Sequence, residues 1–170
     1  MKTENLQEWI GKTEERSDLL NAFPANAMAA TLNHEQLNYS ENKNLPPLWH
    51  WLYFLPIFRL SEAGYDGHAA LGDFLPPVQL PRRMWAGSRI EFLSPLKVGN
   101  EYKKKSKIKD VTAKSGRSGD LVFVTVSHEV SNGSTICINE EHDIVYREKA
   151  TSSSGPAKLI EAPKDFDFSI

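Results

Sequence analysis

The chain has 170 residues, a formal net charge of −2 and a single cysteine. This length fits one domain with a sizeable core, the near-neutral charge argues against general nucleic-acid binding, and one cysteine excludes an intrachain disulfide. The charged first residues and the short apolar stretch 46–58, which Pro56 interrupts, predict neither export nor a membrane span. We therefore expect a cytoplasmic protein.

The first predicted element is a helix. Ser17 and Asp18 are residue types that cap helix N-termini, and residues 24–32 are rich in alanine, which has the highest helix propensity. We expect a helix within 17–33, with a break at Pro24 as the alternative to a continuous one.

Two loops and one ambiguous segment follow the predicted helix. Residues 34–47 are polar and rich in asparagine, which is typical of a loop. The aromatic segment 48–58 is too short for its periodicity to distinguish a helix from a strand. Residues 59–81 contain three glycines and three prolines, so we expect a long, shaped loop of the kind that often carries function.

The second half of the chain predicts an antiparallel sheet. Four extended segments joined by turn sequences cover about 82–94, 101–112, 120–131 and 134–147. Strands of this length make a sheet that twists and curls, and the predicted helix is the upstream element that can fill the curl. We expect an α+β architecture in which one long, curled antiparallel sheet is wrapped around a central helix.

This architecture predicts a single domain over residues 1–150. The sequence TSSSGPA, which follows it, is typical of a flexible linker. We expect a linker and a tail over 151–170.

The last predicted hairpin has two candidate registers. A two-residue turn at Asn132 and Gly133 would place the valines of one strand beside polar residues of the other. A three-residue loop that ends at Gly133 instead pairs Val126 with Ile138. We predict this second, bulged register.

Residues 66–87 combine an acid, an imidazole, two arginines and a tryptophan in one short stretch. Asp66 and His68, which flank Gly67, could act as a base and the group that orients it. The alternative is that Asp66 caps a turn while His68 bonds to the backbone. We favour the turn over a catalytic pair and expect both side chains to line a pocket.

Arg82 and Arg83 begin a predicted strand and face opposite sides of it, so at most one can point into a given pocket. A guanidinium suits a carboxylate or a phosphate, and a local ion pair is the alternative. Trp49, Trp85 and Gly87 could form the wall of an acyl pocket, with plain core packing as the alternative.

The remaining reactive side chains predict no metal and no cofactor. His128 lies on the valine face of its strand, which is typical of a core or interface histidine. Glu140 and His142 are two residues apart without a third ligand, a weak pattern for a metal, and Cys137 alternates with isoleucines like a buried structural thiol. The five lysines within 102–109 fit an exposed strand, with phosphate binding as the alternative.

Several long strings of the sequence resemble one known family. They are LPPLWHWLYF, GYDGHAALGDFLPPVQLPRRMWAGSRIEFLSPLKVGNEY, IKDVTAKSGRSGDLVFVTVSHEV and EEHDIVYRE, and they cover about residues 45–147. They are similar to the FAS1-like dehydratase domain, the amino-terminal half of mesaconyl-CoA and itaconyl-CoA hydratases and of their MaoC-like relatives. EWIGKTEERSD and AMAATLN fit the same pattern, so the resemblance covers nearly the full chain.

The resemblance implies a hot-dog fold and reversible addition of water to a 2-enoyl thioester such as an acyl-CoA. In MaoC-like hydratases the catalytic pair lies in a signature of the form Asn-x-x-His-x-Asp, which in two-domain relatives is in the carboxy-terminal half. This chain lacks that string. We therefore expect it to shape the substrate side of the site, with the catalytic pair supplied by a second MaoC-like hot-dog subunit in a homo- or hetero-oligomer.

Nine residues are candidates for the pocket and its loop under this resemblance. They are Trp49, His50, Asp66, Gly67, His68, Arg82, Arg83, Trp85 and Gly87. One alternative is a self-sufficient homodimeric hydratase that uses Asp66 and His68. Another is a non-catalytic module that binds acyl-CoA, and a thioesterase also remains open because hot-dog folds host both reactions.

Overall fold

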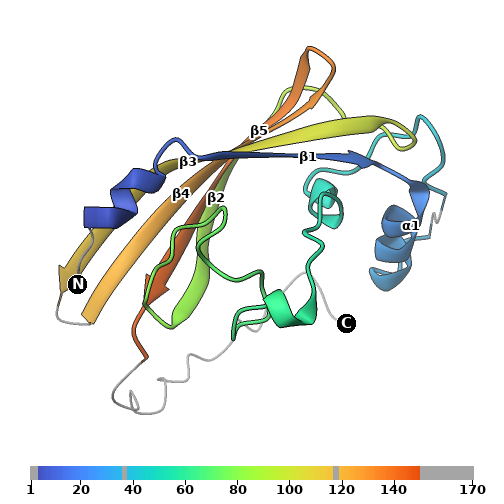
Figure 1. Ribbon diagram of the computed structural model, residues 1–170. Coiled ribbons are helices and arrows are strands. Elements are labelled where there is room, and N and C mark those ends of the chain that lie inside the picture. Colours follow the sequence, from blue (N-terminus) through green and yellow to red (C-terminus); the bar gives the residue numbers. More distant parts are fainter. Residues whose placement is uncertain (1–3, 36–37, 117–118, 150–170) are drawn as a thin grey trace, which may run out of the picture.

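The computed structural model describes residues 4–35, 38–116 and 119–149, and its main feature is one curled antiparallel sheet (Figure 1). The strands are β1 (Thr13–Leu19), β2 (Arg82–Phe92), β3 (Glu101–Gly116), β4 (Gly119–Asn132) and β5 (Thr135–Arg147). Their spatial order is β1-β3-β4-β5-β2, with every neighbouring pair antiparallel. The long strands at the centre twist and bend, as strands of this length do.

Short helical elements accompany the sheet. The α-helix α1 covers Ala22–Thr31, and three 3₁₀ helices cover Glu4–Trp9 (η1), Trp49–Leu52 (η2) and Leu60–Glu62 (η3). None of the helices in the described part of the chain is long and apolar enough to cross a membrane. The predicted linker and tail over 151–170 lie outside the described residues.

Two apolar clusters lie on one face of the sheet, the inner face. The first core joins Leu20 and Ala25 to the ends of three strands, at Tyr102, Val130 and Ile138. The second core lies towards the other end of the same strands. It contains Leu6, Val78, Leu80, Ile108, Val111, Val122, Val124, Val126 and Tyr146. Because strand side chains alternate between faces, the even-numbered valines of β4 all point inward.

The predicted helix begins later than expected, because the residues before it form β1. That edge strand alternates between exposed and half-buried side chains, so it lacks an apolar face that would reveal it in the sequence. Asn21 caps α1 by accepting a hydrogen bond from the backbone N–H of Phe23. Pro24 lies in the first turn, where a missing N–H is tolerated and causes no break.

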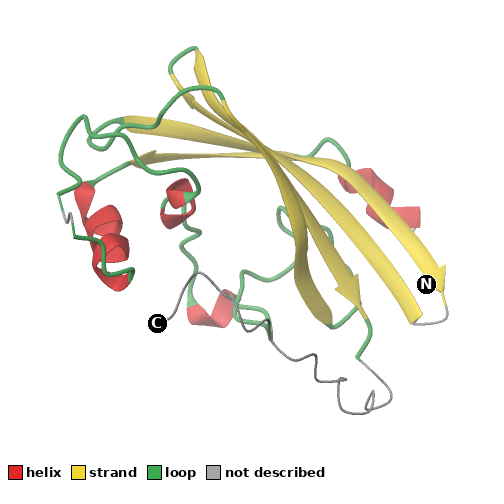
Figure 2. Ribbon diagram, turned by 180° about the vertical axis from the view of Figure 1, so that it is seen from behind, coloured by secondary structure: helices red, strands yellow, loops and turns green. Residues whose placement is uncertain are grey.

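The α+β prediction of a long, curled antiparallel sheet with one helix is confirmed. The helix has ten residues and lies beside the end of the sheet at which β1 ends (Figures 1 and 2). Its fully buried Ala25 and Ala29 pack there, Ala25 as part of the first core. Much of the inner face of the central strands is therefore occupied by side chains other than those of the helix.

The predicted register of the last hairpin was wrong. Asn132 pairs with Thr135, so Gly133 and Ser134 form a two-residue turn, with Gly133 in the left-handed region at φ 55°. A bulge then leaves Cys137 without a partner, and Val130 pairs with Ile138. The turn lies one residue further along the chain than either candidate placed it.

We expect the second core to carry much of the stability of the sheet. Ile108→Ala removes a side chain that is fully buried, and should lower the free energy of unfolding by about 2–5 kcal/mol. Ile136→Ala is the matched control, because Ile136 is 39% exposed and should cost less than about 1 kcal/mol. Urea unfolding followed by circular dichroism measures both, and equal losses would contradict this placement of the core.

Candidate functional site

A row of polar side chains separates the two cores on the inner face of the sheet. Ser106 of β3 pairs with His128 of β4, which in turn pairs with Glu140 of β5. His142 follows Glu140 on the same face, and residues from η2 complete the group. We call Ser106, His128, Glu140, His142, His50 and Trp51 the polar belt.

The carboxylate of Glu140 is the centre of the polar belt. It accepts hydrogen bonds from His50 Nε2 at 3.1 Å, Trp51 Nε1 at 2.9 Å and His142 Nε2 at 2.5 Å. The Glu140 side chain is 3% exposed, and so is that of His50. Burial raises the pKa of Glu140, but the hydrogen bonds from His142 and His50 outweigh it and hold the pKa well below its ordinary value.

This arrangement fixes the tautomers of two histidines. An ionised carboxylate can only accept hydrogen bonds, so the Nε2 atoms of His50 and His142 both carry the proton. In a neutral imidazole the other nitrogen then holds a lone pair. For His142 that nitrogen is Nδ1, and 26% of the side chain is exposed.

The surroundings of His128 keep its imidazole uncharged. Burial is the main cause that lowers its pKa, to about 3, and the neighbouring Lys104 and His142 lower it further. Its Nδ1 lies 2.9 Å from Ser106 Oγ. The ring packs edge-on against that of His142, with centroids 4.8 Å apart. His128 is therefore neutral near pH 7.

Two hydrogen bonds hold the chain at the end of η2, and they help to place His50 and Trp51 over the sheet. Leu48, which precedes η2, has a left-handed backbone at φ 71°. After η2, the Tyr53 hydroxyl donates to Asn21 O at 2.7 Å, and the Phe54 N–H donates to Asp18 Oδ2 at 2.7 Å. These contacts also give Asp18 its role, which is to hold a loop rather than to cap α1.

The structure places Asp66 and His68 apart from the polar belt. Asp66 accepts from the Arg83 guanidinium at 2.8 Å, and also accepts the His68 N–H at 3.2 Å in a turn around Gly67. Burial raises the pKa of Asp66, and the His68 N–H and the Arg83 charge reverse this and lower it. The His68 side chain is 72% exposed, and its Nδ1 lies 3.2 Å from the backbone oxygen of Asp66. This is the turn geometry that the sequence favoured over a catalytic pair.

The other candidate residues divide between the core and the surface. Trp49 packs against the first core and Tyr39, with ring centroids 5.1 Å apart. Trp85 is 62% exposed and lies edge-on to Trp51 at 6.5 Å. Arg82 is exposed, and Gly87 borders a bulge in β2. His50 and Trp85 are thus the two candidates that the fold brings to the polar belt or its edge.

Sequence reasoning missed Glu140, His142 and His128 as a group. Glu140 and His142, which are two apart on a strand and so share a face, had been considered only as a weak metal pair, and His128 had been considered by itself. The signal that could have found them is the register, because only the observed pairing sets His128 beside Glu140 and Val126 beside His142. Within the described ranges, no cluster of three or more His, Cys, Asp or Glu has the arrangement of a metal site.

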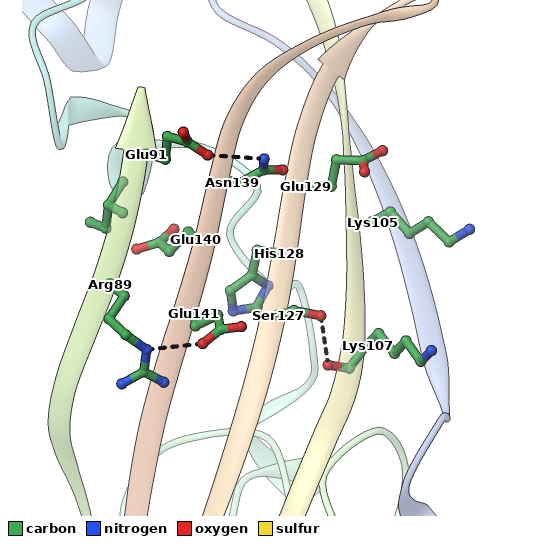
Figure 3. Close-up of a pocket in the computed structure, with 11 residues that line it drawn as sticks. Arg89, Glu91, Lys105, Lys107, Ser127, His128, Glu129, Asn139, Glu140 and Glu141 are labelled. Atoms are coloured by element: carbon green, nitrogen blue, oxygen red, sulfur yellow. Dashed lines mark hydrogen bonds and ion pairs between the residues drawn. The ribbon is translucent and has the colours of Figure 1, made fainter. Parts of the chain in front are cut away.

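Two hollows flank the polar belt. The larger, about 590 Å³, is lined mainly by charged side chains of the outer face, such as Arg89, Glu141 and Lys107, and it also borders His128 and Glu140 (Figure 3). The smaller, about 280 Å³, is bordered by His50, Phe92 and Ile138 and is mostly apolar. An apolar hollow beside His50 suits a short acyl chain better than the charged outer groove does.

Comparison with known proteins finds a family match and a related sequence for this chain. Residues 48–170 match the family described as hydroxyacyl-thioester dehydratase type 2. The chain is 42% identical over 167 residues to a mesaconyl-C(4)-CoA hydratase of Chloroflexus aurantiacus, an alignment that covers 98% of this chain and 59% of that protein. The chain thus spans well under two thirds of the length of this relative.

Two solved structures have a similar fold at low sequence identity. One is the ChsH1-ChsH2 complex of Mycobacterium tuberculosis, with a TM-score of 0.63 at 14% identity, over 92% of this chain and 96% of that one. The other is a hot-dog-like protein of Thermanaerovibrio acidaminovorans, with a TM-score of 0.52 at 11% identity, over 86% and 89% of the two chains. The predicted hot-dog fold is confirmed.

The neutral, half-buried His128 should make the fold less stable in acid. A histidine in the unfolded chain has a pKa of about 6.5, so between pH 6.5 and about 3 the unfolded state binds more protons than the folded one. Stability therefore falls as the pH drops, by about 2 kcal/mol from this group between pH 7 and pH 5.

Urea unfolding at pH 7 and pH 5 tests this assignment. His128→Asn keeps a polar partner for Ser106 but does not titrate, so the difference between the two pH values should shrink by about 2 kcal/mol. His68→Asn, at a largely exposed position, is the matched control and should leave the difference unchanged. An unaltered pH dependence in His128→Asn would show that His128 titrates normally in the folded protein.

Proposed function

The chain belongs to the hydroxyacyl-thioester dehydratase type 2 family, and we propose that it forms the substrate-side half of an enoyl-thioester hydratase or dehydratase. The observation that carries the proposal is the 42% identity to a mesaconyl-C(4)-CoA hydratase along 98% of the chain. Hydration of an enoyl thioester needs a base for water, an acid for the α-carbon and donors for the thioester oxygen.

We propose that a second hot-dog chain supplies the catalytic pair. The Asn-x-x-His-x-Asp signature is absent from the sequence, and the match covers 59% of the relative. Exposed apolar side chains between η2 and the turn at Gly67 support a covering partner, because large patches of this kind mark interaction sites. Their exposed fractions are 63% for Leu55, 100% for Ile57, 91% for Leu60 and 75% for Tyr65.

The alternative that Asp66 and His68 form the catalytic pair has less support. The Asp66 carboxylate is held by Arg83, and the His68 ring is mostly in solvent. A general base needs a free lone pair beside the substrate, in a site that excludes water. We propose instead that this loop shapes the entrance to the site.

The first experiment follows the loss of enoyl-thioester absorbance, with mesaconyl-CoA and crotonyl-CoA as substrates. The purified chain is assayed alone and with a separately produced hot-dog chain that carries the Asn-x-x-His-x-Asp signature. We expect thioester binding by the chain alone and turnover that rises at least about 100-fold when the second chain is added. Asp66→Asn and His68→Ala should each retain turnover within about threefold.

Other outcomes separate the alternatives. Turnover by the chain alone that is lost in both Asp66→Asn and His68→Ala would contradict the partner-supplied pair and identify the loop as an active site. Binding without turnover under any condition would favour a non-catalytic acyl-CoA-binding module. Hydrolysis to free coenzyme A would favour a thioesterase, and absence of binding would overturn the proposal as a whole.

A second prediction concerns the carboxylate of a dicarboxylic acyl group. Arg83 lies on the inner face, in register with the buried Tyr146, whereas Arg82 lies on the outer face in register with Arg147. If Arg83 binds the carboxylate, Arg83→Ala should raise the Kd for mesaconyl-CoA about tenfold and leave crotonyl-CoA, which lacks the carboxylate, within about threefold.

The matched control for this prediction is Arg82→Ala. It removes the same charge from the opposite face and should change neither Kd. Calorimetric titration of each variant with both thioesters measures the difference. Equal effects of Arg83→Ala on the two ligands would show that the arginine only anchors Asp66.

A further inference from the structure

We infer that the small apolar hollow beside His50 holds the hydrocarbon end of the acyl group and sets the longest acyl chain that this protein accepts. The inference rests on the proposed function, because it names the acyl groups that fit the proposed thioester site. It concerns binding and chain length, and leaves the catalytic pair with the second hot-dog chain. We call this cavity the His50 hollow.

The lining of the His50 hollow is apolar. Besides His50, its walls include Leu45, Pro46, Phe92, Pro95, Leu96 and Ile138. No Lys, Arg, Asp or Glu among the described residues lines it. By contrast, the hollow of about 750 Å³ between β1 and the loop after η2 is lined in part by Arg16, Asp18 and Asp73. Because a charge loses its hydration in an apolar pocket, the His50 hollow fits an uncharged hydrocarbon group.

One wall of the His50 hollow is fixed by backbone hydrogen bonds. The Leu45 N–H donates to Leu96 O at 2.7 Å, and Asn44 forms an antiparallel bridge with Lys97. Pro46 follows directly, and its ring fixes the backbone φ angle. This wall is therefore already in place before a ligand binds.

The opposite wall begins where β2 ends. The N–H groups of Leu93 and Ser94 both donate to Cys137 O, at 2.8 and 3.1 Å. Phe92, which precedes them, lies edge-on to the His50 ring with centroids 6.2 Å apart. Phe92 is 47% exposed although it lines the hollow, so its ring lies at the mouth.

The inner end of the His50 hollow is closed by buried side chains. Ile138 and Leu96 are 2% and 4% exposed, and both belong to the first core. His50 is 3% exposed, and its Nε2 donates to Glu140 at 3.1 Å, which holds the ring in place. A pocket with fixed walls and a packed inner end has a fixed depth.

The volume of the hollow gives the length of the acyl chain. A methylene group is about as large as a water molecule, whose share of liquid volume is about 30 Å³. The hollow of about 280 Å³ thus has room for roughly nine such groups, some of them at the open mouth. We expect acyl chains of up to about eight carbons to fit. A longer chain would have to displace Leu96 or Ile138, and overpacking of a core is unfavourable.

A series of saturated acyl-CoA thioesters tests the length limit with the purified full-length protein. Saturated chains cannot be hydrated, so calorimetric titration measures binding alone. From acetyl-CoA up to about eight carbons, the Kd should fall at least about twofold for each added carbon, because each methylene group leaves water. From there to dodecanoyl-CoA the Kd should stay level or rise. A constant Kd, or a fall that continues to dodecanoyl-CoA, would overturn the inference.

Phe92→Ala tests the position of the acyl chain. Loss of the ring at the mouth should raise the Kd for octanoyl-CoA about tenfold and change that for acetyl-CoA less than about twofold. Leu93→Ala is the matched control, because Leu93 is 50% exposed and does not line the hollow. It should change neither Kd by more than about twofold. Equal effects of the two variants on octanoyl-CoA would contradict the placement.

Leu96→Ala tests the inner end. The shortened side chain deepens the hollow, so the length at which the Kd stops falling should increase by about two carbons. Val130→Ala is the matched control, because Val130 is fully buried in the same core without lining the hollow. Its length limit should stay at that of the unsubstituted protein. Circular dichroism verifies folding, and Phe92→Ala keeps the inference falsifiable if Leu96→Ala does not fold.

The outcomes separate this inference from the proposed function. Absence of binding by every acyl-CoA overturns the proposed function, and the inference falls with it. Binding that is insensitive to Phe92→Ala overturns the inference alone. Arg83 lies near the start of β2 and Phe92 at its end, about 30 Å apart at about 3.3 Å per residue, so one short acyl group cannot reach both. Selective loss of mesaconyl-CoA binding in Arg83→Ala would therefore also overturn the inference and leave the proposed function intact.

Discussion

One buried carboxylate links the η2 loop to the histidine of a neighbouring position on the sheet. Glu140 accepts hydrogen bonds from two residues of η2 and from one of its own strand. The η2 segment is about ninety positions away in the chain, so this contact fixes the loop against the sheet as well as the histidines against each other. If the carboxylate were missing, three N–H donors would lose a partner, and the donor of His50, whose side chain is 3% exposed, would be left buried without one.

The position of this carboxylate explains why the core is divided in two. An uninterrupted apolar inner face would bury more apolar surface, yet the strands β3, β4 and β5 change from apolar to polar and back at the same level. Buried polar groups are tolerated where each finds a partner. Within the belt, the Nε2 atoms of His50 and His142 bond to Glu140, and Nδ1 of His128 lies within hydrogen-bond distance of Ser106 Oγ. The belt thus replaces apolar packing with a fixed set of hydrogen bonds, and such a departure from a continuous core is typical of functional sites.

The sequence predicted the sheet well because β2 to β5 each have turn residues at their ends and long extended runs between them. It failed for β1, whose half-exposed side chains lack an apolar face, and for the hairpin, where a single unpaired residue changes which side chains are neighbours. The loop from Asp66 to Arg83 was predicted as a turn with a local ion pair among the alternatives, and both are observed. The polar belt was not predicted, because its members come from β3, β4, β5 and η2, and only the tertiary register brings them together.

The bulge at Cys137 has a consequence for how this hairpin can vary. The tip of the hairpin, from Ser131 to Ile136, is paired in one register, and the strands beyond the bulge are paired in another. A change in the length of the tip can be absorbed where the ladder is already interrupted. The length and sequence of the tip can therefore vary while Glu140 and His142 keep their pairing with β4.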